Sequence, residues 1–259
     1  MPGLPGYIRR SGFLEGIVVL IVLACGILGW GWLMQVTVER IDVRGTTNAL
    51  PEEIRELAGV DSGDVMFQIQ SEVVADRVAR HPWVANTTIT RLPTGVLILG
   101  IQERDPIVQV LLPSGRPGFY LDRDGYPMQP SDSSSYDVPL LSGYRDDFHP
   151  TSPSADEQTL RFLTALDGER TKAGILISEI VLREGEVWLW LEPSGRHGST
   201  PVRLGADNFQ NKLKRLAAFW TQRVSRSQDR EFQLIDLRFS NQIISREEKR
   251  DIPLQFTDP

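Results

Sequence analysis

The most uneven feature of the hydrophobic pattern is an uncharged, apolar run near the amino terminus, residues 16–38. A bilayer core of about 30 Å is spanned by about 20 apolar residues in a helix. Trp30 and Trp32 lie toward the far end of the run, where aromatic side chains sit at the level of the lipid headgroups. The pattern predicts one transmembrane helix over residues 14–35, preceded by a short tail of residues 1–13.

A cleaved signal peptide is the alternative interpretation of this run. Its apolar region would be about 7–15 residues long and would end in small residues of the A-x-A type, whereas this run ends in Trp-Gly-Trp-Leu-Met. A twin-arginine export signal fits less well, because one residue too many separates the two arginines from Phe13-Leu14. Since Lys and Arg mark the cytoplasmic flank of a span, Arg9 and Arg10 predict that the tail is cytoplasmic and that the bulk of the chain lies outside.

Residues 36–106 predict the order β-α-α-β-β. The expected elements are a strand ending at Gly45, helices at about residues 51–59 and 71–80, and strands at 84–91 and 96–102. Pro51 suits the first helical turn, and Gly59 and Pro82 suit helix ends. Three strands with both helices on one face make an α+β domain. Trp83, directly after Pro82, is expected to pack between the helices and the sheet of this domain.

Residues 107–246 predict a mixed, β-rich domain with two helices, at 155–168 and 207–224. Its last strands are expected at 232–239 and 242–246, and residues 247–259 are expected to be a flexible tail. Trp188 and Trp190 alternate along one strand and share one face. That face is either packed under a helix or is a docking patch, and the sequence leaves both interpretations open.

Composition argues against nucleic-acid binding and against most catalytic chemistry. Lys and Arg total 28 against 34 Asp and Glu, a net charge of −6, so no basic surface for phosphates is expected. A single cysteine excludes an intramolecular disulfide, and the three histidines are scattered. His197 is expected in a solvated loop. Asp122-x-Asp124-Gly125 lacks the further ligands of a calcium loop and predicts a hairpin turn. We therefore predict no catalytic, cofactor-binding or metal-binding residues and no small-molecule substrate.

Several short motifs occur in a recognisable order. They are Ile41-Asp42-Val43-Arg44-Gly45, His81-Pro82-Trp83-Val84, Arg91-Leu92-Pro93, Glu103-Arg104-Asp105-Pro106 and Ile235-Asp236-Leu237-Arg238-Phe239. The first four resemble a POTRA domain. A short tail, one span, one POTRA domain and the last motif together resemble the FtsQ/DivIB family of cell-division proteins. Members of that family often carry Tyr where Phe239 stands, so any contact made by that hydroxyl is missing here.

The resemblance implies a non-enzymatic, bitopic scaffold in the cytoplasmic (inner) membrane at the division septum. Its implied partners are other division proteins, especially small bitopic coiled-coil proteins. The family's binding site falls on Leu237, Arg238, Phe239 and Ser240, with helix 207–224 beside it. We expect strand 234–244 to be a sheet edge to which a partner adds a strand. A second possible edge is strand 85–91, with Asn86, Thr88 and Thr90.

Two other functions compete with this interpretation. A membrane-anchored, exported cell-wall enzyme would bring catalytic side chains together in one cleft. A POTRA component of a secretion or outer-membrane assembly system would usually carry repeated POTRA modules or a long barrel, and neither an internal repeat nor a series of amphipathic strands is visible.

Overall fold

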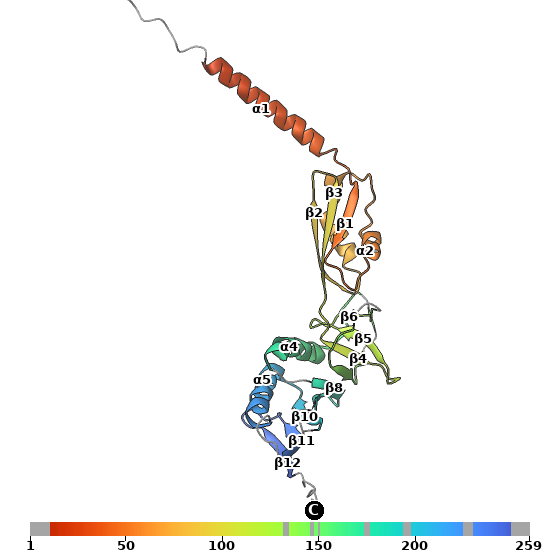
Figure 1. Ribbon diagram of the computed structural model, residues 1–259, viewed down its shortest axis with the longest axis vertical. Coiled ribbons are helices and arrows are strands. Elements are labelled where there is room, and N and C mark those ends of the chain that lie inside the picture. Colours follow the sequence, from red (N-terminus) through yellow and green to blue (C-terminus); the bar gives the residue numbers. More distant parts are fainter. Residues whose placement is uncertain are drawn as a thin grey trace, which may run out of the picture. The chain divides into compact units, whose positions relative to one another are not determined.

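The computed structural model describes residues 11–131, 135–145, 148–149, 151–173, 177–193, 198–224 and 230–249 (Figure 1). Arg9, Arg10, His197 and residues 250–259 lie outside the described residues. The chain divides into two compact units. The first comprises Met1–Ala79 and Val84–Gln102, and the second comprises Arg80–Trp83 and Glu103–Pro259.

The first unit begins with one long apolar helix and continues in the order that the sequence predicts. Its elements are α1 (Ser11–Leu33), β1 (Arg40–Arg44), α2 (Pro51–Ala58), the 3-10 turn η1 (Met66–Gln68), α3 (Ser71–Val78), β2 (Val84–Arg91) and β3 (Val96–Glu103). Within α1, Glu15–Leu33 is long and apolar enough to cross a membrane. The β-α-α-β-β order and the α+β fold class are confirmed.

The sheet of the first unit has the order β1-β3-β2, with β1 parallel to β3. Pro51 occupies the first turn of α2, and Gly59 ends that helix in a left-handed conformation with φ 58°, which only glycine adopts without strain. Buried side chains of the helices, Ile54, Val74 and Val78, join those of β3 in the core. Because β3 is central, β2 lies at an edge of this sheet, as expected.

The described residues of the second unit form one sheet of nine strands covered by two helices. The strands are β4 (Val108–Leu111), β5 (Pro117–Leu121), β6 (Pro127–Met128), β7 (Leu140–Ser142), β8 (Ile177–Arg183), β9 (Glu186–Leu191), β10 (Thr200–Gly205), β11 (Arg230–Asp236) and β12 (Ile244–Lys249). Their order is β12-β11-β10-β9-β8-β7-β4-β5-β6. The helices are α4 (Glu157–Ala173) and α5 (Phe209–Phe219), the latter continued by η2 (Trp220–Val224), and they contact each other (Figure 1).

The core of this unit lies between the two helices and one face of the sheet. Phe162 and Leu163 of α4 and Leu216 of α5 pack with Val187 and Leu189 of β9. Alternate residues of a strand point to opposite faces, so Trp188 and Trp190 lie on the face away from the helices. Both are half-buried there, and the interpretation that a helix packs over them is wrong.

The predicted edge at residues 234–244 is also wrong. Helix α5 connects β10 to β11, and these two strands pair in parallel, with Val202 opposite Ile235. Since β12 then pairs with the other side of β11, β11 is an interior strand and β12 is the edge. The last strand extends to Lys249, so the first three residues of the expected tail, 247–249, belong to β12.

The turn between β5 and β6 is held by a buried ion pair. Arg104 donates to Asp122 Oδ2 at 2.7 Å, and their side chains are 11% and 6% exposed. The other carboxylate oxygen, Oδ1, accepts hydrogen bonds from the main-chain N–H groups of Asp124 and Tyr126. The carboxylate is thus satisfied within the turn, which confirms the hairpin interpretation of this motif.

Trp83 is buried as expected, with 4% of its surface exposed, but its partners are not those predicted. Its ring centroid lies 5.8 Å from that of Tyr136 and 6.3 Å from that of Tyr120. The indole N–H donates to the carbonyl oxygen of Gln129 at 3.0 Å. A buried indole N–H needs an acceptor, and the Gln129 carbonyl supplies one. Because these three partners all belong to the second unit, Trp83 packs in that unit.

We expect Trp83→Ala to lower the free energy of unfolding of the second unit by about 3–5 kcal/mol, because it removes a buried ring and leaves the Gln129 carbonyl without its donor. Denaturant titration of the full chain in detergent, followed by circular dichroism, measures the change. Trp188→Ala, which removes a ring that is only half-buried, is the matched control and should cost less. An unchanged midpoint for Trp83→Ala would contradict this placement.

Candidate functional site

The four residues predicted to bind a partner lie just after β11, and they do not share one environment. The strand ends at Asp236, so the alternation expected across residues 237–240 stops there. Leu237 is fully buried in the core, and its main-chain N–H donates to the carbonyl oxygen of Arg203 at 2.9 Å. Arg238, Phe239 and Ser240 are exposed. Leu237 is therefore a core residue, and the other three form the exposed part of the predicted site.

Arg238 is held by acidic residues of the sheet. Its Nε and Nη2 donate to the two carboxylate oxygens of Asp236, at 3.0 and 2.8 Å. Glu186 on β9 lies 3.8 Å from Nη1 and also accepts from Arg203 Nε at 2.6 Å. A bidentate pair fixes the plane of the guanidinium group. Arg238 is thus oriented on the sheet while it stays exposed.

Phe239 presents an apolar ring on a backbone that helix α5 holds in place. Arg215 of α5 donates from Nη1 to the carbonyl oxygen of Phe239 at 2.9 Å and from Nη2 to that of Gln242 at 2.7 Å. Phe239 is 41% exposed, and the Arg238 guanidinium lies 5.8 Å from the centroid of its ring. The helix expected beside the site is therefore there, and it anchors the connection from β11 to β12.

Strand β12 supplies an exposed edge next to this connection. Ile244, its first residue, is 47% exposed and lies opposite Asp236 in the β11–β12 register. Ser240 lies in a bend between β11 and β12. Its main-chain N–H is therefore not part of the hydrogen bonding between these strands, and a proline at this position would not test the edge. The main-chain groups available to a partner strand belong to β12 instead.

The second predicted edge is present as a structural feature. Asn86, Thr88 and Thr90 are exposed and alternate along the edge strand β2, so they share one face. Thr88 Oγ1 donates to the carbonyl oxygen of Gly100 on β3 at 3.2 Å. Whether a partner uses this edge stays a prediction.

The Trp188–Trp190 pair lies on the same open face of the sheet as Arg203. The two ring centroids are 6.3 Å apart, and the Arg203 guanidinium lies 5.1 Å from the centroid of Trp188. Arg203 in turn pairs with Glu186. A chain of contacts therefore connects Trp188, through Arg203 and Glu186, to Arg238.

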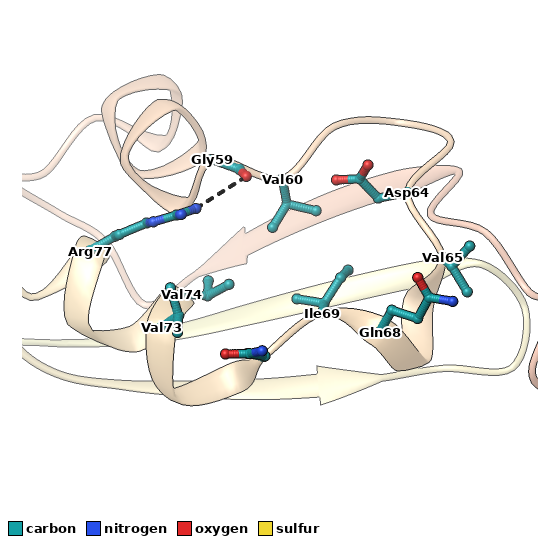
Figure 2. Close-up of a pocket in the computed structure, with 10 residues that line it drawn as sticks. Gly59, Val60, Asp64, Val65, Gln68, Ile69, Val73, Val74 and Arg77 are labelled. Atoms are coloured by element: carbon teal, nitrogen blue, oxygen red, sulfur yellow. Dashed lines mark hydrogen bonds between the residues drawn. The ribbon is translucent and has the colours of Figure 1, made fainter.

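The groove beside the helices of the first unit shows no arrangement of catalytic groups. This groove of about 430 Å³ lies between α2, η1 and α3, and Figure 2 shows Arg77 reaching from α3 to the carbonyl oxygen of Gly59. Its lining is mainly valine, isoleucine and glutamine, with Asp64 as the carboxylate. No group of three or more His, Cys, Asp or Glu side chains among the described residues could hold a metal ion.

One carboxylate at the site has a perturbed pKa. Burial raises the pKa of Asp236, but the hydrogen bonds and positive charge of Arg238, with the charge of Arg203, outweigh burial and hold it below its usual range. Ionised Asp236 therefore stabilises both the end of β11 and the orientation of Arg238. The sequence analysis predicted Arg238 but not Asp236 as a site residue. The two residues are two positions apart, so on an extended strand they would share one face, and this spacing could have suggested the pair.

Comparison with known proteins supports a division role. A family model described as POTRA domain, FtsQ-type, matches residues 36–104, and one described as FtsQ/DivIB, C-terminal related, matches residues 105–246. The chain is 46% identical to the cell division protein FtsQ of Rhodothermus marinus, over 93% of this chain and 90% of that protein. It is 39% identical to the cell division protein FtsQ of Salinibacter ruber, over 90% of this chain and 91% of that protein.

Acid should destabilise the site through Asp236. An aspartate has a pKa of about 3.9 in an unfolded chain, and the folded value is lower, so ionisation favours the folded state. This contribution is complete above about pH 5 and is lost as the pH falls through 3.9 and then through the folded pKa. We expect Asp236→Asn to flatten the decline of the urea midpoint between about pH 5 and 3. Parallel pH profiles for wild type and variant would contradict this account.

Proposed function

The chain belongs to the FtsQ/DivIB family of cell-division proteins, and on that premise we propose that it is a non-enzymatic, single-pass scaffold that recruits and links septal proteins. Helix α1 anchors it in the cytoplasmic membrane, with the amino terminus inside and residues 36–259 outside. The POTRA domain, residues 36–106, and the β domain, residues 107–246 with the rest of β12, present the binding surfaces. No catalytic step, cofactor or small-molecule substrate is part of the proposal.

The exposed edge of β12 beside Phe239 is the observation that carries the proposal. In an antiparallel strand, alternate residues direct both their N–H and C=O groups to the same side. Since β11 occupies one side of β12, alternate residues of β12 direct these groups away from the sheet. A partner strand can complete them, so that main-chain hydrogen bonds supply affinity and neighbouring side chains supply specificity.

Arg238 and Phe239 suit the role of side-chain anchors next to this edge. Aromatic and arginine residues dominate the binding energy of many interfaces, and both of these are exposed on a connection that Arg215 holds. We propose small bitopic coiled-coil division proteins as the partners here. The edge of β2, with Asn86, Thr88 and Thr90, is proposed as a second docking edge for another septal protein.

The topology can be tested with reporter fusions. A reporter that is active only outside the cytoplasm should be active when it follows Pro259 and inactive when it precedes Met1, because Arg9 and Arg10 precede the apolar run. Replacing both arginines with glutamate should reduce the outside signal of the carboxyl-terminal fusion. Activity of the amino-terminal fusion alone would overturn the proposed orientation.

The binding edge can be tested by separating folding from capture. We expect Phe239→Glu to keep a cooperative melt but to weaken the capture of a division partner by about tenfold or more, because a charge replaces an exposed aromatic anchor. Leu112→Glu, which places the same charge on another exposed apolar residue, is the matched control and should capture normally. A collapsed melt for Phe239→Glu would show that the ring is needed for folding.

Proline substitutions along β12 give an independent check of the edge. Arg246 and Glu247 are adjacent, so one of their N–H groups points toward β11 and the other away from the sheet. Proline at the outward position should abolish capture and leave the melt nearly unchanged, whereas proline at the inward position should lower the melting temperature. Normal capture by both variants would exclude β12 as the binding edge.

A further inference from the structure

Strand β12 presents an alternating series of side chains on the open face of the sheet. Ser245 and Glu247 lie opposite Ile235 and Phe232 of β11, whose side chains are buried in the core, so these two residues of β12 point to the helix side. Ile244, Arg246 and Glu248 point to the other face and are exposed. A strand added to β12 would meet these three side chains on the open face.

The charges of Arg246 and Glu248 are not balanced by the strand that β12 already pairs with. The register places Leu234 opposite Arg246 and Glu231 opposite Glu248. Therefore β11 places an apolar residue, and no carboxylate, directly opposite Arg246. Gln233 donates its side-chain amide to Glu248, which supplies a hydrogen bond but no positive charge. The charges of Arg246 and Glu248 are thus open to complement from the outer side of β12.

From this register we propose that the strand bound by β12 carries an acidic side chain opposite Arg246, a basic one opposite Glu248 and an apolar one opposite Ile244. The inference rests on the edge-binding function proposed above and names the chemistry of the partner. Directly opposite residues of paired strands lie about 5 Å apart, and each opposite-charge pair should strengthen binding by about 1.5- to 5-fold. Like charges at these positions weaken binding, so the same pair of residues also rejects unsuitable strands.

A second copy of the chain meets this pattern only in part. Two copies of β12 can pair antiparallel about a two-fold axis, and one register sets Arg246 opposite Glu248 in both directions. That register also places Glu247 opposite Glu247 of the other copy, which sets two acids against each other on the helix side. A different protein, with the apolar–acidic–basic series at alternate positions, fits the edge better.

A selection experiment reads this specificity directly. The target is the full-length chain in detergent micelles, and the probe is a displayed library of threonine-rich strands in which three alternate positions vary among Val, Thr, Glu and Lys. Wild type should enrich the series apolar–acidic–basic, read along the strand in one direction or the other. The double variant Arg246→Glu with Glu248→Lys should enrich apolar–basic–acidic instead. Each target should prefer its own series by about tenfold.

A matched variant controls for the change of charge itself. Arg183→Glu with Glu184→Lys exchanges the charges of an exposed pair in the β8–β9 turn, again with no change in net charge, and should enrich the same series as wild type. Enrichment of identical strands on all three targets would overturn the charge inference and leave the edge-binding function standing. Capture of no strand on any target, the all-threonine strand included, would overturn the edge-binding function and this inference with it.

Discussion

The parallel pairing of β10 with β11 is the interaction on which the rest of the second unit depends. A parallel pair needs a crossover connection, and α5 with η2 provides it between Gly205 and Arg230. Leu237 continues this pairing by donating its N–H to Arg203, which draws its side chain into the core. Strand β11 thus has β10 on one side and β12 on the other. As a result β12 is the edge strand, and the connection between β11 and β12 is exposed. The positions of Phe239, Arg238 and Ile244 all follow from this one pairing.

An exposed edge is a hazard as well as a binding surface, and the sequence of β12 reflects both. Charged side chains along an edge strand discourage unplanned pairing, and β12 contains Arg246, Glu247, Glu248 and Lys249. Its apolar residue, Ile244, stands at the end nearest Phe239 in sequence. The edge thus combines an apolar end with a charged stretch, and in the proposal above the first receives an anchor and the second selects the strand. This combination suits the scaffold role proposed for the chain.

Local signals were enough to predict the first unit and the helices of the second. Pro51, Gly59 and the alternation of β2 and β3 act over a few residues, and each produced the expected element. The failures concern pairing between distant segments. Trp83 contacts Tyr120 and Tyr136, and β11 pairs with β10 across the α5 crossover. Neither the ring contacts nor the strand pairing is indicated by residues nearby in the sequence. The family resemblance placed Leu237 and Phe239 in one site, but the strand ends at Asp236 and Leu237 turns into the core.

Site-specific photocrosslinking in dividing cells tests the central claim most directly. A photoreactive residue is placed at Glu248 on β12, and in a separate variant at Arg183, the last residue of β8 before the β8–β9 turn, each in the full-length chain. The account predicts that the β12 position crosslinks to a single-pass division protein and that the turn position does not. Crosslinks that form from the turn but not from β12 would contradict the claim that this edge is where the scaffold binds its partner.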